Sequence, residues 1–145
     1  MHEARAMAEM SRQLIEAGLG WRYTPRRIAA LMADAETVAL VAHDGAVLQG
    51  LAVMQFGDEQ AHLVLLCVRP AQHRRGIGRR LTEWLIASAR VAGIASIRLE
   101  LRADNAAALA FYRGLGFAET AWIADYYEGQ VAARRMSLQL RNAAN

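Results

Sequence analysis

The hydrophobic pattern of this chain changes its period near residue 37, and no other feature of the sequence constrains the fold as strongly. Before that point, apolar residues recur at helical spacing over residues 3–17. A second helix is expected from Pro25 to about Ala33, with Thr24 as its N-cap. After residue 37, apolar and polar residues alternate as they do in β-strands. The chain therefore opens with two helices and continues with strands.

Turn residues divide the remaining sequence into short elements. Strands over residues 37–43 and 46–56 are expected to form a hairpin around Asp44-Gly45. The elements expected after it are a strand over 62–68, a helix to about residue 92, a strand over 94–101, a helix that Asp104 or Asn105 caps and that runs to Arg113, and strands over 117–127 and 131–140. No linker or repeat divides the chain, so residues 1–145 are interpreted as one domain. Its class is α+β or mixed α/β, with a β-α-β unit at its centre.

Composition limits the chemistry that this domain can perform. All 17 basic side chains are arginine, so a catalytic or Schiff-base lysine is excluded. The net charge of +3 and the isoelectric point near 9.6 favour anionic partners without naming one. A general compositional bias explains much of the arginine content equally well, because alanine is also enriched, with 30 residues.

Cysteine and histidine usage points to a reducing compartment and to no metal. Cys67 is the only cysteine, which excludes an internal disulfide framework and a multi-cysteine metal site. The four histidines, at positions 2, 43, 62 and 73, have no metal-ligand spacing. Charged residues interrupt the first twenty positions, and no later run is long enough to span a membrane. We therefore expect a cytoplasmic protein with no membrane partner.

The segment from residue 69 to residue 81 combines Gly76 and Gly78 with several arginines where a strand gives way to a helix. Unpaired amides at a helix N-terminus attract phosphate, and glycine lets the phosphate approach them closely. An ordinary loop with a solvated basic edge shows the same pattern. A Walker loop is excluded because it requires lysine, and a dinucleotide fingerprint does not fit because Leu81 occupies the position of its third glycine.

Two motifs in this region resemble those of the GNAT superfamily of N-acetyltransferases, most closely the ribosomal-protein-alanine N-acetyltransferase group. The run from His73 to Gly78 is similar to the acetyl-CoA loop Arg/Gln-x-x-Gly-x-Gly/Ala, with histidine in its first place. The block from Asn105 to Phe117 follows the pattern Asn-x-x-Ala-x-x-x-Tyr-x-x-x-Gly-Phe. The resemblance covers roughly residues 37–127 and implies a mostly antiparallel central sheet flanked by helices, with the β-α-β unit binding acetyl-CoA.

The resemblance also implies which residues bind acetyl-CoA. Backbone groups of Leu66, Cys67 and Val68 would hold the pantetheine and polarise the thioester carbonyl, in a cleft where the strand before the loop splays from the strand after the helix. Asn105 would contact the CoA arm, and His73 would meet a phosphate or cap the loop. The residues whose amides would take the pyrophosphate are Arg74, Arg75, Gly76, Ile77, Gly78 and Arg79.

Two residues match the catalytic positions of that family. An amine arrives as an ammonium ion and needs a general base, for which Glu100 is the candidate; Tyr112 would protonate the departing thiolate. Each has a structural alternative, because Glu100 alternates with Arg98 and Arg102 along a strand and Tyr112 can serve core packing. An acetyl-cysteine route through Cys67 is not favoured, since no histidine is placed by sequence to activate the thiol.

The acceptor is an amine of a small molecule or of a protein N-terminus. Residues in segments that flank the cleft in the family are Trp21, Tyr23, Trp122, Asp125, Tyr126 and Tyr127. A homodimer is compatible with the sequence. Two alternatives stay open: a basic nucleic-acid-binding module, which leaves the block after Asn105 unexplained and is less favoured, and an acetyl-CoA-binding domain without catalysis.

Overall fold

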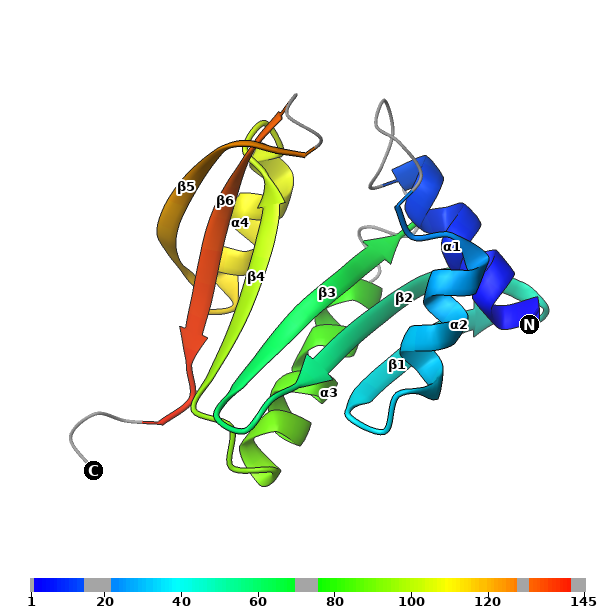
Figure 1. Ribbon diagram of the computed structural model, residues 1–145, viewed down its shortest axis with the longest axis horizontal. Helices are drawn as coiled ribbons and strands as arrows, with labels where there is room; N and C mark the ends of the chain where they lie inside the picture. Colours follow the sequence, from blue (N-terminus) through cyan, green and yellow to red (C-terminus); the bar gives the residue numbers. More distant parts are fainter. Residues whose placement is uncertain (1, 15–21, 70–75, 128–130, 142–145) are drawn as a thin grey trace.

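A computed structural model of the chain describes residues 2–14, 22–69, 76–127 and 131–141 (Figure 1). These residues form helices and strands in the order that the sequence predicts. The elements are α1 (His2–Leu14), α2 (Pro25–Ala33), β1 (Thr37–Asp44), β2 (Val47–Phe56), β3 (Gln60–Val68), α3 (Ile77–Val91), β4 (Ser96–Arg102), α4 (Ala106–Gly114), β5 (Ala118–Tyr127) and β6 (Val131–Gln139). The expected mixed fold class, with a β-α-β unit at the centre, is therefore confirmed.

The strands form one six-stranded sheet in the order β1-β2-β3-β4-β6-β5. All neighbouring strands are antiparallel except β3 and β4, the two strands that α3 connects. This parallel pair extends over only three residue pairs, residues 60–62 with 96–98. Beyond them the two strands diverge, and the sheet opens into a V between two three-stranded halves (Figure 1). We call the line between β3 and β4 the seam.

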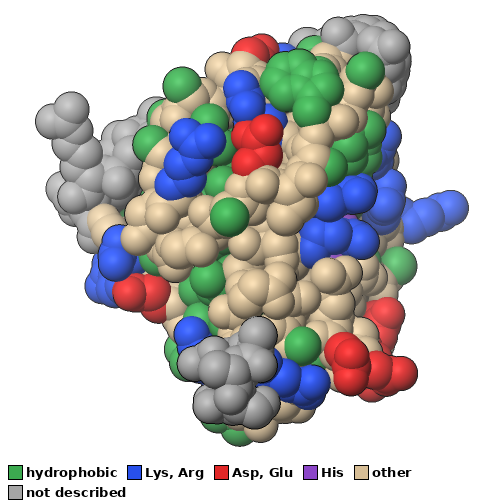
Figure 2. All heavy atoms as spheres, turned by 90° about the vertical axis from the view of Figure 1, so that its left-hand side faces the viewer, with side chains coloured by type: hydrophobic (Ala, Val, Ile, Leu, Met, Phe, Trp, Pro, Cys, Tyr) green, Lys and Arg blue, Asp and Glu red, His purple; other side chains and the backbone are tan. Residues whose placement is uncertain are grey.

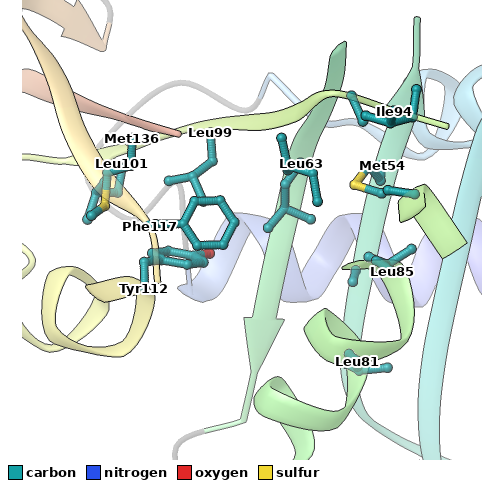
Figure 3. Close-up of a cluster of buried hydrophobic side chains, with 14 of the residues drawn as sticks. Met54, Leu63, Leu81, Leu85, Ile94, Leu99, Leu101, Tyr112, Phe117 and Met136 are labelled. Atoms are coloured by element: carbon teal, nitrogen blue, oxygen red, sulfur yellow. The ribbon is translucent and has the colours of Figure 1, made fainter. Parts of the chain in front are cut away.

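Helices cover both faces of the sheet and bury two apolar clusters. Helices α3 and α4 lie on one face, and α1 and α2 lie on the other (Figure 1). The larger cluster contains Leu85 of α3, Leu63 of β3 and Leu99 of β4, so it spans the seam (Figure 3). The second cluster contains Met7 of α1 and Leu51 of β2. Apolar packing on the α3 side therefore joins the two halves where the backbone ladder ends.

A β-bulge divides strand β3. In the pairing with β2, Leu65 lies opposite Val53 while Leu63 lies opposite Met54, so Val64 is an extra residue. An extra residue reverses the alternation of side chains between the two faces of a strand. Leu63 accordingly belongs to the cluster under α3, whereas Leu65 belongs to the cluster under α1. The bulge therefore lies in the part of β3 that borders the opening of the V.

Local capping explains where the helices begin and end. Thr24 accepts a hydrogen bond from the amide of Arg27 at 3.3 Å and caps α2, as expected. Gly93 has a φ of +79°, and the amide of Ile94 donates to the carbonyl of Ala89 at 3.0 Å. The left-handed conformation of Gly93 and this hydrogen bond keep Ile94 in the turn. Strand β4 therefore begins at residue 96 and not at the expected residue 94. The expected first helix extends to residue 17, and its last three residues lie outside the described part of the chain.

Candidate active site

The opening of the seam exposes backbone groups of β3. The amide of Arg69 donates to the carbonyl of Gln49 at 2.9 Å, toward the β2 side. Backbone groups alternate in direction along an antiparallel strand, so those of Leu66 and Val68 point to the β4 side. There, within the described residues, β4 pairs with β3 only as far as residue 62. The backbone groups of Leu66 therefore face the opening, where an extended ligand can lie along β3, whereas those of Cys67 point to the β2 side. Ligand contacts of Leu66, Cys67 and Val68 stay a prediction.

The N-terminus of helix α3 lies next to the C-terminal end of β3. Gly76 precedes the helix with a φ of +73° and makes no side-chain cap. The amides of Ile77, Gly78 and Arg79 lie in the first turn, where amides have no intrahelical partner and the helix dipole is positive. A β-carbon placed on Gly78 would lie 3.5 Å from Val68 and 3.6 Å from Phe111, so α3 starts close to β3 and α4. The predicted residues His73, Arg74 and Arg75 lie outside the described residues.

Helix α4 contributes the two other residues that the family motif singles out. Asn105 caps this helix, because its Oδ1 accepts a hydrogen bond from the amide of Ala108 at 3.0 Å. The carboxamide nitrogen of Asn105 is not used in this cap and can still donate. Tyr112 is 8% exposed and makes edge-to-face contacts with Phe111 and Phe117, at centroid distances of 5.2 and 5.6 Å. Its hydroxyl points from α4 toward the side of the cluster where Leu63 lies (Figure 3).

Glu100 lies on β4 inside a cluster of four charged or polar side chains. Its Oε1 is 2.8 Å from Nε2 of His62, across the seam. Its Oε2 accepts a hydrogen bond from Nε of Arg135 at 2.9 Å and lies 3.3 Å from Nε of Arg98. The side chain of Glu100 is only 5% exposed, whereas that of His62 is 28% exposed. We call these four residues the Glu100 cluster.

The Glu100 cluster keeps its carboxylate ionised. Burial of Glu100 alone would raise its pKa, but the hydrogen bonds from His62 and Arg135 and the charges of His62 and Arg98 lower the pKa to about 2. A carboxylate with so low a pKa is a weak proton acceptor by itself. The structural alternative for Glu100 was an alternating row of charges with Arg98 and Arg102 along β4. Arg98 does contact Glu100, but Arg102 pairs with Asp104 at 3.4 Å.

The sequence did not reveal two members of this cluster. His62 and Arg135 lie 38 and 35 residues from Glu100 in the chain. Adjacency of the strands on either side of α3 was expected, but no feature of the sequence gives the register of a three-pair parallel ladder. In the structure, His62 lies opposite Arg98, and Arg135 lies opposite Glu100.

Cys67 is not a nucleophile in this structure. The thiol is buried, and burial raises its pKa to about 12, while the charge of Arg69 lowers it only in part. A thiol in this state is protonated at neutral pH. This agrees with the expectation that an acetyl-cysteine route is not favoured.

The aromatic residues expected near the acceptor are only partly described. Tyr23 stacks under the guanidinium of Arg27 at 4.6 Å, and Trp122, 57% exposed, lies under that of Arg134 at 5.0 Å. Figure 2 shows the side of the molecule on the left of Figure 1, where arginine, acidic and apolar side chains alternate over the surface. Tyr126 lies on β5, while Trp21 and the side chains of Asp125 and Tyr127 are not described.

Neither a metal site nor a membrane-spanning helix is found in the part of the chain that the structure describes. Among the described residues, no group of three or more histidine, cysteine, aspartate or glutamate side chains could hold a metal ion. No helix among them is both long and apolar enough to cross a membrane.

Comparison with known proteins defines the class of protein. The model of the acetyltransferase (GNAT) family matches residues 6–117, and the chain belongs to this family. It is 42% identical over 76 residues to the ribosomal protein bS18-alanine N-acetyltransferase of Escherichia coli K12, a match that covers 52% of this chain and 51% of that protein. It is 48% identical over 60 residues to the N-alpha-acetyltransferase RimI of Mycobacterium tuberculosis, covering 41% of this chain and 36% of that protein. The first match thus spans about half the length of its curated relative.

Solved structures match over nearly the whole chain. The crystal structure of the ribosomal-protein-S18-alanine N-acetyltransferase from Escherichia coli aligns with a TM-score of 0.83 and 29% identity, covering 99% of this chain and 91% of that one. A putative acetyltransferase from Salmonella typhimurium, solved with its cofactor acetyl-CoA, has the same fold, with a TM-score of 0.78 and 24% identity. The expected family and sheet architecture are therefore confirmed.

Proposed function

We propose that this domain transfers an acetyl group from acetyl-CoA to a primary amine by direct attack. The observation that carries the proposal is the seam: an open edge of β3, a helix N-terminus at one end and Tyr112 beside it belong to one continuous region. Membership in the acetyltransferase (GNAT) family supports the same activity.

The residues present fit acetyl-CoA as the donor, which would supply an activated thioester carbonyl. The first-turn amides of α3 suit a pyrophosphate, and neither Gly76 nor Gly78 carries a side chain that would cover them. Backbone groups of Leu66 can hydrogen-bond an amide-containing arm laid along β3. An amide donor fixed at this edge would stabilise the negative charge that develops on the carbonyl oxygen.

Proton transfer needs two further groups. In this proposal Tyr112 donates its hydroxyl proton to the departing sulfur. Its phenol is a weak acid, and α4 holds it in the apolar cluster on the α3 side of the sheet. The acceptor nitrogen must lose a proton before it attacks. Titratable groups that could take this proton, Glu100 and His62, lie in the Glu100 cluster on the same seam. This cluster is on the face of the sheet opposite to Tyr112.

We favour the α-amine of a protein N-terminus as the acceptor over a small-molecule amine. The support is that the relatives at 42% and 48% identity are named for N-terminal acetylation. A peptide that begins with alanine is the first acceptor to test, since the relative in Escherichia coli is an alanine N-acetyltransferase.

The test combines calorimetry with a thiol-release assay. Acetyl-CoA should bind in calorimetry, and a panel of amines and N-terminal peptides should release CoA thiol. Tyr112→Phe keeps the aromatic packing and removes only the hydroxyl, so kcat should fall about 100-fold while the dissociation constant of acetyl-CoA stays within about twofold. No binding at millimolar acetyl-CoA would refute the proposal, binding without thiol release would indicate a non-catalytic binding domain, and an unchanged kcat would exclude Tyr112 from its role.

A further inference from the structure

The Glu100 cluster leaves the proton acceptor of the reaction undefined. A protonated α-amine has an ordinary pKa of about 8, well above the ordinary glutamate value of 4.5, and the hydrogen bonds from His62 and Arg135 lower the pKa of Glu100 further. Transfer of a proton to this carboxylate alone is therefore strongly unfavourable. Both oxygens of Glu100 are also engaged, Oε1 with His62 and Oε2 with Arg135. The acceptor is therefore better sought among the groups that Glu100 contacts.

His62 is the member of the cluster that reaches solvent. Its ring lines a pocket of about 390 Å³, together with Asp34, Glu36, Gln60 and Arg98. Glu100 lies behind the ring and is almost completely enclosed. The imidazole thus stands between a buried carboxylate and a pocket that is open to water.

The hydrogen bond to Glu100 determines which ring nitrogen can accept a proton. An ionised carboxylate only accepts hydrogen bonds, so in the neutral ring Nε2 carries the hydrogen and donates it to Oε1 of Glu100. Nδ1 then keeps its lone pair, and no hydrogen bond to Nδ1 is found within the described part of the chain. A histidine oriented by a carboxylate in this way is a familiar arrangement for a general base.

We propose that His62 is the proton acceptor for the acceptor amine, with Glu100 as the positioning residue that fixes its tautomer and stabilises the imidazolium. This inference rests on the proposed acetyltransferase function. The N–H bond of the ammonium breaks and an N–H bond forms at Nδ1 of His62, directly or through one water of the pocket. The imidazolium then releases that proton to solvent. When the amide forms, the nitrogen loses a second proton, which reprotonates the oxygen of Tyr112 after Tyr112 has protonated the sulfur. The net release is therefore one proton, the one that His62 passes to solvent.

The charges around His62 can accommodate an imidazolium. The negative groups that face the ring are Glu100 on β4 and, from the segment between α2 and β1, Asp34 and Glu36 across the pocket. The positive groups are Arg98 on β4 and, beyond Glu100, Arg135 on β6. Three carboxylates thus offset two guanidinium groups.

The experiment is the pH profile of kcat/KM for His62→Gln, from about pH 6 to about pH 9.5, with the peptide acceptor. The substitution removes the proton acceptor and leaves a side chain of similar length. We expect kcat/KM to fall about 100-fold at neutral pH. The deficit should shrink as the pH approaches the pKa of the acceptor amine, which then no longer needs a base. Added imidazole should restore activity to His62→Ala.

His43→Gln is the matched control, because Nε2 of His43 also lies 2.8 Å from a carboxylate, that of Glu3, far from the seam. It should leave the profile of kcat/KM unchanged. A His62→Gln profile parallel to that of the wild type, or no rescue of His62→Ala by imidazole, would overturn the assignment while the wild type remains active. An inactive wild type that still binds acetyl-CoA would instead overturn the proposed function, and the role of His62 with it.

Discussion

Replacing Glu100 with glutamine should reveal how much the charged cluster stabilises the fold. The pKa of Glu100 falls from an ordinary 4.5 to about 2 in the folded chain. At about 1.4 kcal/mol per pK unit, the ionised carboxylate contributes about 3 kcal/mol to the free energy of unfolding at neutral pH. Because the folded-state pKa lies below the unfolded one, this contribution is complete above about pH 5 and is lost as the pH falls toward 2. Glu100→Gln should therefore cost about 3 kcal/mol at pH 7 and only about 1 kcal/mol at pH 3.

Urea unfolding of both proteins at the two pH values measures this difference. Glu83→Gln is the control, because Glu83 and Arg79 form an exposed pair at 3.4 Å, and such pairs contribute less than about 1 kcal/mol. A loss for Glu100→Gln that is the same at pH 7 and pH 3 would refute the argument, since it would reflect packing and not charge. So would a loss no larger than that of the control.

Two further outcomes test the cofactor edge and the buried thiol. Gly78→Ala places its β-carbon at ordinary contact distances of 3.5 and 3.6 Å, so the free energy of unfolding should stay within about 0.5 kcal/mol while the dissociation constant of acetyl-CoA, measured by calorimetry, rises at least about tenfold. Gly50→Ala, by contrast, meets three atoms at 3.1 to 3.2 Å and should lower the free energy of unfolding by about 1 to 3 kcal/mol. Cys67, with a pKa of about 12, should resist a thiol reagent at pH 8 in the folded protein and react after denaturation. Equal reaction rates of Cys67 in the folded and the denatured protein would contradict the prediction of a buried thiol. Equal acetyl-CoA affinities of Gly78→Ala and the wild type would contradict the predicted pyrophosphate site.

Local signals made most of the secondary structure predictable. Thr24, Gly93 and Asn105 each determine one helix end through a short-range bond or a left-handed backbone conformation, and such effects depend on nearby residues alone. The strand boundaries shifted by up to two residues, as at β4, because tertiary hydrogen bonds decide where pairing starts. One example is the bond from the amide of Ala95 to the carbonyl of Glu59, at 2.7 Å.

The candidate site was predictable only where one continuous motif defines it. Gly76, Asn105 and Tyr112 lie in local patterns, and the structure places them around the start of α3 and on α4. The partners of Glu100 were not predictable, because a hydrogen bond from His62 depends on the register of a ladder with three residue pairs. The bulge at Val64 was also not anticipated, since a run of apolar residues does not show where the alternation reverses.

The parallel pair of β3 and β4 is short, and this affects how related sequences can change the width of the opening. Within each half of the sheet, the spacing of the strands is set by backbone hydrogen bonds, which do not depend on side-chain identity. Past residue 62 the two halves meet through the apolar side chains of one cluster, among them Leu63 and Leu99. Substitutions at these positions can widen or narrow the opening without breaking a ladder. A few apolar residues can therefore determine how large an acceptor the opening admits, while the binding edge of β3 stays unchanged.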